Sequence, residues 1–211
     1  MSRFLPLFPL NIVVFPGEKL NLHIFEPRYR QLIMECLTYD TTFGIPVYLE
    51  NGIGEYGTEI KILSLEKKYL GGEMDIKTKG LGIFKIKEFQ KQVPGRLYSG
   101  GEIEDVKLVH DDEPLQRIQI IELLRQLYTA LGIQSLMIKL KDNFQSYEVA
   151  HHLGFTTQQE YALLQCVKES DRLEIILEHL TRIVPVVLET ERLKERVKLN
   201  GHFKNLVPPN F

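Results

Sequence analysis

The closest match to a known chemical site is a glycine motif in the middle of the chain. Gly52-Ile53-Gly54-Glu55-Tyr56-Gly57 fits the GxGxxG pattern, which binds a dinucleotide pyrophosphate when a helix follows it. Thr58 to Leu65 has the pattern of a strand instead, and Thr58-Glu59 stands where an ATP-binding loop needs Lys-Ser/Thr. The motif therefore predicts a glycine-rich hairpin loop without a nucleotide.

Three further groups have chemically competent residue types. Ser64 and Lys67 have the SxxK spacing of a nucleophile and its base, but on a strand these positions point to opposite faces. His151 and His152 diverge by about 100° on a helix, so we expect solvated or capping roles. The acidic run 111–113 fits a solvated linker better than a cation site. We therefore expect no catalytic residue, no metal and no cofactor.

The elements around these groups have the two-residue period of strands in the first half of the chain. Apolar and polar residues alternate over Leu20 to Ile24, Ile45 to Leu49 and Phe84 to Lys87. Between Ile60 and Leu65 the apolar positions change parity at 62/63, which predicts a β-bulge and a bent strand. Glycine- and proline-containing turns separate these runs.

One predicted helix interrupts the strands. Pro27 suits a first helical turn, and one apolar face follows at helical spacing, made by Tyr29, Leu32, Ile33, Cys36 and Leu37. Many short strands with a single helix predict a small, mostly antiparallel β-barrel over residues 1–110.

The helical period dominates after the acidic stretch 110–114, which is the expected linker. Several short helices in under 100 residues predict a small α-helical bundle over residues 111–211. Thr157 and Glu160 have the spacing of a capping box, and Pro185 should end or kink the last helix. The predicted fold class is thus α+β, with a barrel followed by a bundle.

Composition and charge narrow the function. The chain has 211 residues, 44% of them hydrophobic and 26% charged, and a net charge of −2. These values are ordinary for a globular protein. Neither half of the chain is basic enough to bind phosphate groups, so nucleic-acid binding is disfavoured. The apolar run 4–15 is too short to span a membrane and lacks a cleavage site, so we expect a cytoplasmic protein. Cys36 and Cys166 are expected to be buried free thiols.

Three segments near the start of the chain form a specific pattern of prolines and aromatic residues: Leu5-Pro6-Leu7-Phe8-Pro9-Leu10, Phe15-Pro16-Gly17 and Leu22-His23-Ile24-Phe25-Glu26-Pro27-Arg28-Tyr29-Arg30. This pattern resembles the opening of the N-terminal substrate-binding domain of Lon proteases. Weaker matches follow at 43–45, 56–60, 79–84 and 102–104. The resemblance covers residues 1–110 and implies a PUA-like β pseudo-barrel followed by a helical bundle.

What the resemblance implies about function is non-catalytic capture of unfolded or degron-bearing polypeptide. Lon adds an ATPase module and a serine–lysine protease domain, which this chain lacks, so we expect a stand-alone binding module and not an enzyme. It could serve as an adaptor for a separate ATP-dependent protease, and a homodimer is possible. The alternative is a PUA-like module that binds RNA or a small ligand in a localised basic groove; an undiscovered enzyme is a third interpretation.

Capture of unfolded chain requires exposed apolar side chains or a free strand edge. The candidate binding residues are aromatic side chains predicted near loop tips, on an outward strand face or in the tail: Tyr48, Tyr56, Tyr69, Phe203 and Phe211. In Glu26-Pro27-Arg28-Tyr29-Arg30 we expect Glu26 to favour the helix start and an arginine to brace the barrel by an ion pair.

Overall fold

The computed structural model describes residues 2–111 and 114–203, with side chains except at 138–139 and 199–203. The chain forms two compact units, and each is described by itself. The barrel unit comprises Met1–Val109 and Tyr147–Lys168, and the helical unit comprises His110–Ser146 and Glu169–Phe211. The sequence placed all of 111–211 in the bundle, whereas segment 147–168 packs with the barrel.

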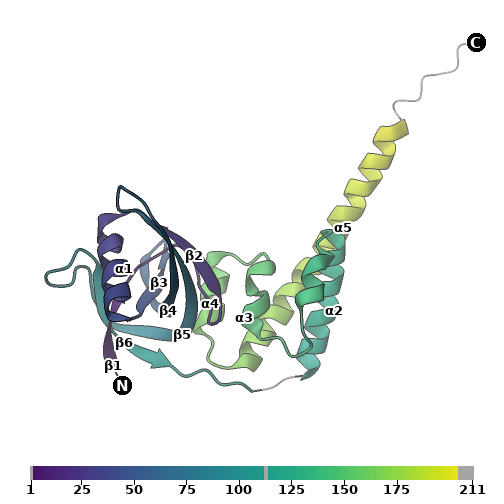
Figure 1. Cartoon of the computed structure of the whole chain (residues 1–211). Coiled ribbons are helices and arrows are strands. Elements are labelled where there is room, and N and C mark those ends of the chain that lie inside the picture. Colours follow the sequence, from purple (N-terminus) through teal and green to yellow (C-terminus); the bar gives the residue numbers. More distant parts are fainter. Residues whose placement is uncertain (1, 112–113, 204–211) are drawn as a thin grey trace, which may run out of the picture. The chain divides into compact units, whose positions relative to one another are not determined.

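The barrel unit is built from a mainly antiparallel sheet that closes on itself (Figure 1). Its strands are β1 (Ser2–Leu7), β2 (Lys19–Ile24), β3 (Phe43–Leu49), β4 (Gly52–Lys68), β5 (Met74–Gln90) and β6 (Ser99–Val106). The order is β2-β5-β4-β3-β1-β6, and an additional β5–β6 pairing closes the ring. The predicted α+β architecture, with a β-barrel and then helices, is confirmed.

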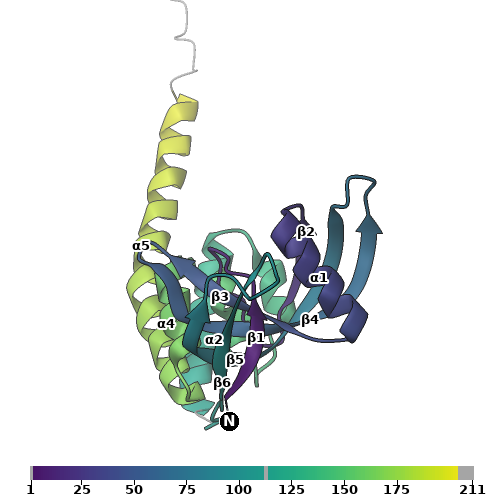
Figure 2. The same cartoon turned by 90° about the vertical axis from the view of Figure 1, so that its left-hand side faces the viewer.

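Strands β4 and β5 are longer than the closed ring needs. The second half of β5 pairs with β6 over 83–90, whereas its first half pairs with β2 over 74–79. Residues 61–68 of β4 pair with β5 alone, because β3 reaches only Ile60. We call the resulting three-stranded part, made of 19–24, 61–68 and 74–80, the sheet extension; Figure 2 shows its β4–β5 hairpin standing out beside the helix α1.

The bulge predicted at 62/63 is confirmed, because the β4–β5 register shifts between Ile62 and Ser64. A second shift lies between Leu65 and Lys67. Each bulge inserts a residue into one strand, bends it and returns the following side chains to their former face.

The core of the barrel unit includes the apolar face of α1 (Pro27–Tyr39), as predicted. Pro27 occupies the first helical turn, and Asp40 ends the helix in the left-handed conformation with φ of 49°. The buried side chains on this face are Tyr29, Leu32, Ile33 and Cys36. Burying each apolar side chain of this size contributes roughly 1.5–3 kcal/mol, so this face anchors α1 to the barrel.

Segment 147–168 contributes α4 (Thr157–Gln165) to the barrel unit, with α3 (Ser146–Val149) and η2 (Ala150–His152) before it. The capping box is one residue earlier than predicted. Gln159 N–H donates to Thr156 Oγ1 (3.3 Å), and Thr156 N–H donates to Gln159 Oε1 (2.9 Å). Glu160, the predicted partner, bonds His151 instead.

His151 joins three parts of the barrel unit. Its Nδ1 lies 2.7 Å from Glu160 Oε1, and its Nε2 lies 3.0 Å from Glu18 Oε2. Its ring lies 4.8 Å from that of Phe15, which stacks on Tyr147 at 4.9 Å. The bonds to Glu160 and Glu18 raise the pKa of His151 to about 10. His151 is therefore a protonated side chain that links Glu18 to Glu160, and the prediction of a solvated or capping role is wrong.

The helical unit is formed by α2 (Pro114–Ala130), η1 (Gln134–Lys139) and α5 (Glu169–Phe203), with α2 packed along α5. Pro185 lies inside α5 and does not end it, unlike one of the two predicted outcomes. The interior includes Ile120, Leu124, Leu173 and Leu180.

A buried polar cluster in this unit holds residues from distant parts of the chain. Glu169, 1% exposed, accepts hydrogen bonds from Ser146 N–H (2.7 Å), from Ser146 Oγ (2.8 Å) and from Arg172 Nη2 (2.8 Å). Arg117 Nη2 lies 3.8 Å from the same carboxylate.

A second carboxylate contacts the start of α5. The Ser170 hydroxyl and N–H donate hydrogen bonds to Asp111, and these bonds lower the pKa of Asp111 to about 2. Asp111 thus accepts hydrogen bonds from the first turn of α5 and is not only a solvated linker residue.

Replacing Glu169 by Ala should lower the free energy of unfolding of the helical unit by about 3–5 kcal/mol, because removing one partner of a buried ion pair leaves a buried charge. Urea unfolding with hydrogen exchange of the α5 amides measures this loss. Glu174→Ala, at an exposed position of the same helix, is the matched control. A loss below about 1 kcal/mol for Glu169→Ala would contradict the assigned role of the cluster.

The stability that His151 contributes should depend on pH. The pKa of histidine in an unfolded chain is about 6.5, and in the folded barrel unit that of His151 is about 10. The contribution is therefore fully present below about pH 6.5, falls as the pH rises and is lost above about pH 10. The difference in Tm between the wild type and His151→Gln should shrink over this window. Glu160→Gln should move the upper limit of the window to lower pH, and a pH-independent difference would refute the ion-pair role.

Candidate functional site

The outer face of the sheet extension collects polar side chains in three cross-strand rows. Strand alternation and the register place paired residues on the same face. The rows are Lys19–Lys79–Lys61, Asn21–Lys77–Ser64 and His23–Asp75–Lys67.

The first row consists of lysines alone. Lys19 and Lys61 lie directly opposite Lys79 on its two sides, and all three are exposed. Like charges directly opposite one another destabilise a sheet. Within residues 2–111 and 114–203, no carboxylate forms an ion pair with any of these lysines, whereas Lys77 in the next row lies 2.7 Å from Glu66. The extension therefore presents uncompensated positive charge, which an anionic group can neutralise.

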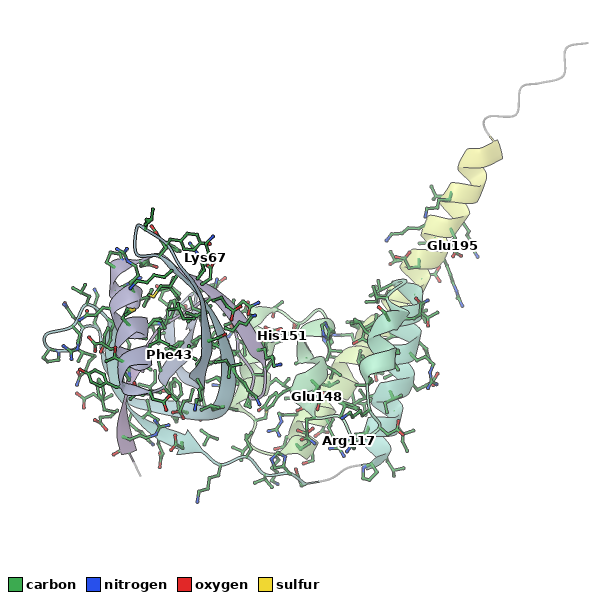
Figure 3. The ribbon with its side chains drawn as sticks, viewed as in Figure 1. Phe43, Lys67, Arg117, Glu148, His151 and Glu195 are labelled. Atoms are coloured by element: carbon green, nitrogen blue, oxygen red, sulfur yellow. The ribbon has the colours of Figure 1, made fainter. Side chains whose placement is uncertain are left out.

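The third row forms a hydrogen-bonded cluster near the tip of the β4–β5 hairpin. His23 Nδ1 lies 2.7 Å from Asp75 Oδ1, and the Tyr69 hydroxyl donates to Asp75 Oδ2 (2.7 Å). The bonds from His23 and Tyr69 lower the pKa of Asp75. Lys67, labelled near the tip in Figure 3, places Nζ 4.3 Å from the centre of the Tyr69 ring. The candidate residue Tyr69 thus belongs to this cluster.

Beside this cluster lies a groove of about 310 Å³, lined by Asn21, Leu22, His23, Glu66, Asp75, Ile76 and Lys77. Apolar side chains of the extension and its ends are also exposed, namely Phe25, Leu63, Leu65 and Leu70. The extension thus presents exposed apolar side chains along β4 and at the hairpin tip, and uncompensated lysines at its other end, which suits an extended ligand that carries both apolar and acidic groups.

The hairpin tip is fixed to α1 by an arginine. Arg30 Nη1 donates to the carbonyl of Gly71 in the β4–β5 turn (2.5 Å). Arg28 instead pairs with Glu26 at 2.8 Å, and its guanidinium lies over the Tyr29 ring. An arginine therefore braces the barrel unit, but the prediction that it does so by an ion pair is wrong: Arg30 bonds a backbone carbonyl and so positions the end of the extension.

Tyr48 lies at a second groove of the barrel unit. Its side chain is half exposed and stands opposite the buried Val47, as the alternation predicted. The groove, of about 400 Å³, lies between the end of β3 and the start of α4, and its lining also includes Asn11, Leu49, Glu50 and 156–158. Tyr48 stays a predicted binding residue.

Tyr56 and the glycine motif serve the contact between β4 and α4. The Tyr56 N–H donates to the Tyr161 hydroxyl (3.1 Å), and a Cβ at Gly54 would come within 2.6 Å of that hydroxyl. Gly57 lies equally close to β3, since a Cβ there would be 2.5 Å from the Ile45 carbonyl oxygen. The residues after the motif are extended, as expected. The glycines of the motif themselves lie within strand β4, so the prediction of a hairpin loop is wrong.

The remaining predicted sites have simple outcomes. Ser64 and Lys67 share a face because of the second bulge, so the prediction of opposite faces is wrong. Ser64 Oγ nevertheless donates to Glu66 (2.5 Å), and Lys67 lies over Tyr69. The Phe203 side chain and all of Phe211 lie outside the described residues.

The described part of the chain contains no cluster of three or more His, Cys, Asp or Glu side chains that could hold a metal ion. None of its helices has the length and apolar character needed to cross a membrane.

Comparison with known proteins places this fold in a family. Residues 4–182 match the family model described as the ATP-dependent protease La (LON) substrate-binding domain. The chain belongs to the Lon substrate-binding domain family. The resemblance inferred from the first thirty residues is thereby confirmed, and the match extends beyond residues 1–110 into α5.

Individual relatives agree with this membership. The chain is 22% identical over 228 aligned positions to a Lon protease of Heliobacterium modesticaldum, covering 92% of this chain and 26% of that protein. The Lon-type domain thus spans about a quarter of that relative, and the matched family model is the substrate-binding domain, not the ATPase or protease domain.

Two solved structures show the same fold. A Lon N-terminal domain protein from Xanthomonas campestris superposes with a TM-score of 0.65 and 26% identity, covering 83% of this chain and 98% of that one. The N-terminal domain of a Mycobacterium avium complex Lon protease gives a TM-score of 0.68 at 16% identity, with 85% and 98% covered.

Repulsion within the lysine row should lower the free energy of unfolding of the barrel unit. Replacing Lys79 by Glu converts two like-charge contacts into opposite-charge pairs with Lys19 and Lys61, so it should raise the free energy of unfolding by about 0.2–1 kcal/mol. Lys77→Glu, on the same face of β5, should have the opposite effect because it opposes Glu66. Urea unfolding of the two variants tests this; equal effects of both would show that the row is not repulsive.

Proposed function

We propose that this Lon-type domain binds unfolded or degron-bearing polypeptide segments and presents them, chemically unchanged, to an ATP-dependent protease. The observation that supports this most directly is the sheet extension, which exposes Phe25, Leu63, Leu65 and Leu70 and, at its other end, carries the lysine row. Membership of the Lon substrate-binding family agrees with the same role.

The proposed mechanism is the burial of apolar side chains that folded proteins hide. Each square ångström of apolar surface removed from water contributes roughly 25 cal/mol, so a few side chains give moderate affinity. Once one segment of an unfolded chain is bound, its other segments are held at a high effective concentration, so several weak contacts together raise the affinity. Moderate affinity suits an adaptor, because a bound segment must be released to its protease.

We place this function in the cytoplasm. Cys36, in the buried face of α1, is a free thiol, and a thiol of this kind is typical of proteins from reducing compartments.

The alternative function is binding of RNA or a small ligand, and the lysine row is the observation that favours it for an anionic ligand. Such binding would weaken steeply with salt, because phosphate contacts release counterions. Polypeptide capture would weaken much less with salt, because only its acidic side chain is screened while the burial of apolar side chains persists, and this difference separates the two functions.

The test compares one model protein in its folded and permanently unfolded forms by fluorescence titration. We expect the unfolded form to bind at least ten-fold more tightly, a difference of about 1.4 kcal/mol. The double variant Leu63→Ser and Leu65→Ser should lose most of this preference. Leu97→Ser, an exposed leucine in the β5–β6 loop, is the matched control. Equally weak binding of both forms by the wild type would end the capture proposal.

A further inference from the structure

The sheet extension has an unpaired edge at β2. This strand is the last in the sheet order and hydrogen-bonds β5 alone. Within the described residues of the barrel unit, no other helix or strand packs extensively against it. Lys19, Asn21 and His23 are exposed. A strand edge with this exposure can accept a further strand.

The backbone groups on this edge can be assigned from the register. Gly80 N–H donates to the carbonyl of Glu18 (2.8 Å), and the antiparallel pairing then continues without a shift to Ile24–Met74. Hydrogen-bonded and non-hydrogen-bonded residues alternate in such a pair. The even-numbered residues of β2 therefore bond β5, while Lys19, Asn21 and His23 direct their N–H and C=O groups outward.

The opposite edge of the extension is protected. Residues 61–68 of β4 carry both bulges, which break the regular spacing of N–H and C=O groups. This edge also carries Lys61, Glu66, Lys67 and Lys68. Bulges and charged residues are the devices that prevent edge-to-edge pairing. The pairing of β2 with β5 has no register shift, so the β2 edge lacks the bulges that protect the β4 edge.

We infer that the β2 edge binds an extended polypeptide segment that pairs with residues 19–24 and places an acidic side chain opposite Lys19. This inference rests on the proposed function and names its ligand and binding mode. The incoming residues opposite Lys19, Asn21 and His23 face the outer side, where a carboxylate neutralises the lysine row. Their neighbours face the inner side, next to the half-buried Leu20 and Leu22, and are apolar. The ligand is thus an alternating apolar and acidic strand without proline.

The charge of the row alone would also attract nucleic acid. An extended polypeptide is favoured because the edge offers donors and acceptors at the two-residue repeat of a strand, which a phosphate backbone cannot match. Short single-stranded RNA is therefore included in the test as a competing ligand.

The experiment uses fluorescent ten-residue peptides with alternating leucine and glutamate, titrated against the whole chain. A peptide methylated on alternate backbone nitrogens, and so lacking the N–H donors of one edge, should bind at least ten-fold more weakly. In NMR hydrogen exchange, the unmodified peptide should protect the amides of Asn21 and His23 and leave that of Leu22 unchanged. Equal binding of both peptides, or no new protection on β2, overturns the inference.

Charge variants test the acidic position. Lys79→Glu, expected to be at least as stable as the wild type, should weaken binding of the glutamate peptide about ten-fold and favour a peptide with lysine at those positions. Lys91→Glu, the same change at an exposed position outside the extension, should bind like the wild type. If single-stranded RNA displaces the peptide and binds more tightly, the site is for nucleic acid and the inference is wrong.

The outcome also separates this inference from the proposed function. If unfolded protein binds but neither β2 nor the lysine row responds, capture is real and occurs elsewhere on the domain. If neither unfolded protein nor peptide binds, both proposals fail.

Discussion

Closure of the barrel determines which parts of the strands remain outside the ring and form sheet edges. The ring closes through β5 and β6, and this pairing involves only residues 83–90 of the seventeen-residue strand β5. The first half of β5 must satisfy its hydrogen bonds outside the ring, with β2 on one side and β4 on the other. A closed sheet has no edges, so the edges available in this part of the molecule come from this surplus length.

The extension is held rigid by contacts that lie away from its exposed face. Arg30 ties the hairpin turn to α1, and α1 is anchored by its buried apolar face. At the other end, His151 links Glu18, just before β2, to Glu160 of α4. The position of β2 is therefore controlled by residues that need not touch a ligand, as expected when a binding surface is supported by a rigid framework.

The sequence predicted the local elements well because their signals are local. Pro27 and the following apolar face indicated α1, and the parity change at 62/63 indicated the bulge. The cap of α4 was misplaced by one residue because Thr156 and Thr157 are equally good caps, and the choice is coupled to the distant partner of Glu160. The lysine row could not be predicted, since the residue opposite Lys79 depends on every bulge between the strands. The packing of α4 on the barrel depends on Tyr161 meeting Gly54, a contact with no signal in either segment alone.

The path of the chain between the two units has a practical consequence. The chain passes from one unit to the other after Val109, after Ser146 and after Lys168. A protease that cuts after Val109 separates the sheet from the rest of the chain covalently but leaves segment 147–168 attached to the helical unit. Expressing residues 1–109 alone would leave Gly54 and Phe15 without Tyr161 and Tyr147, exposing apolar surface that the intact chain covers. Dissection of this protein therefore requires a graft that carries segment 147–168 along with the barrel, rather than a simple truncation.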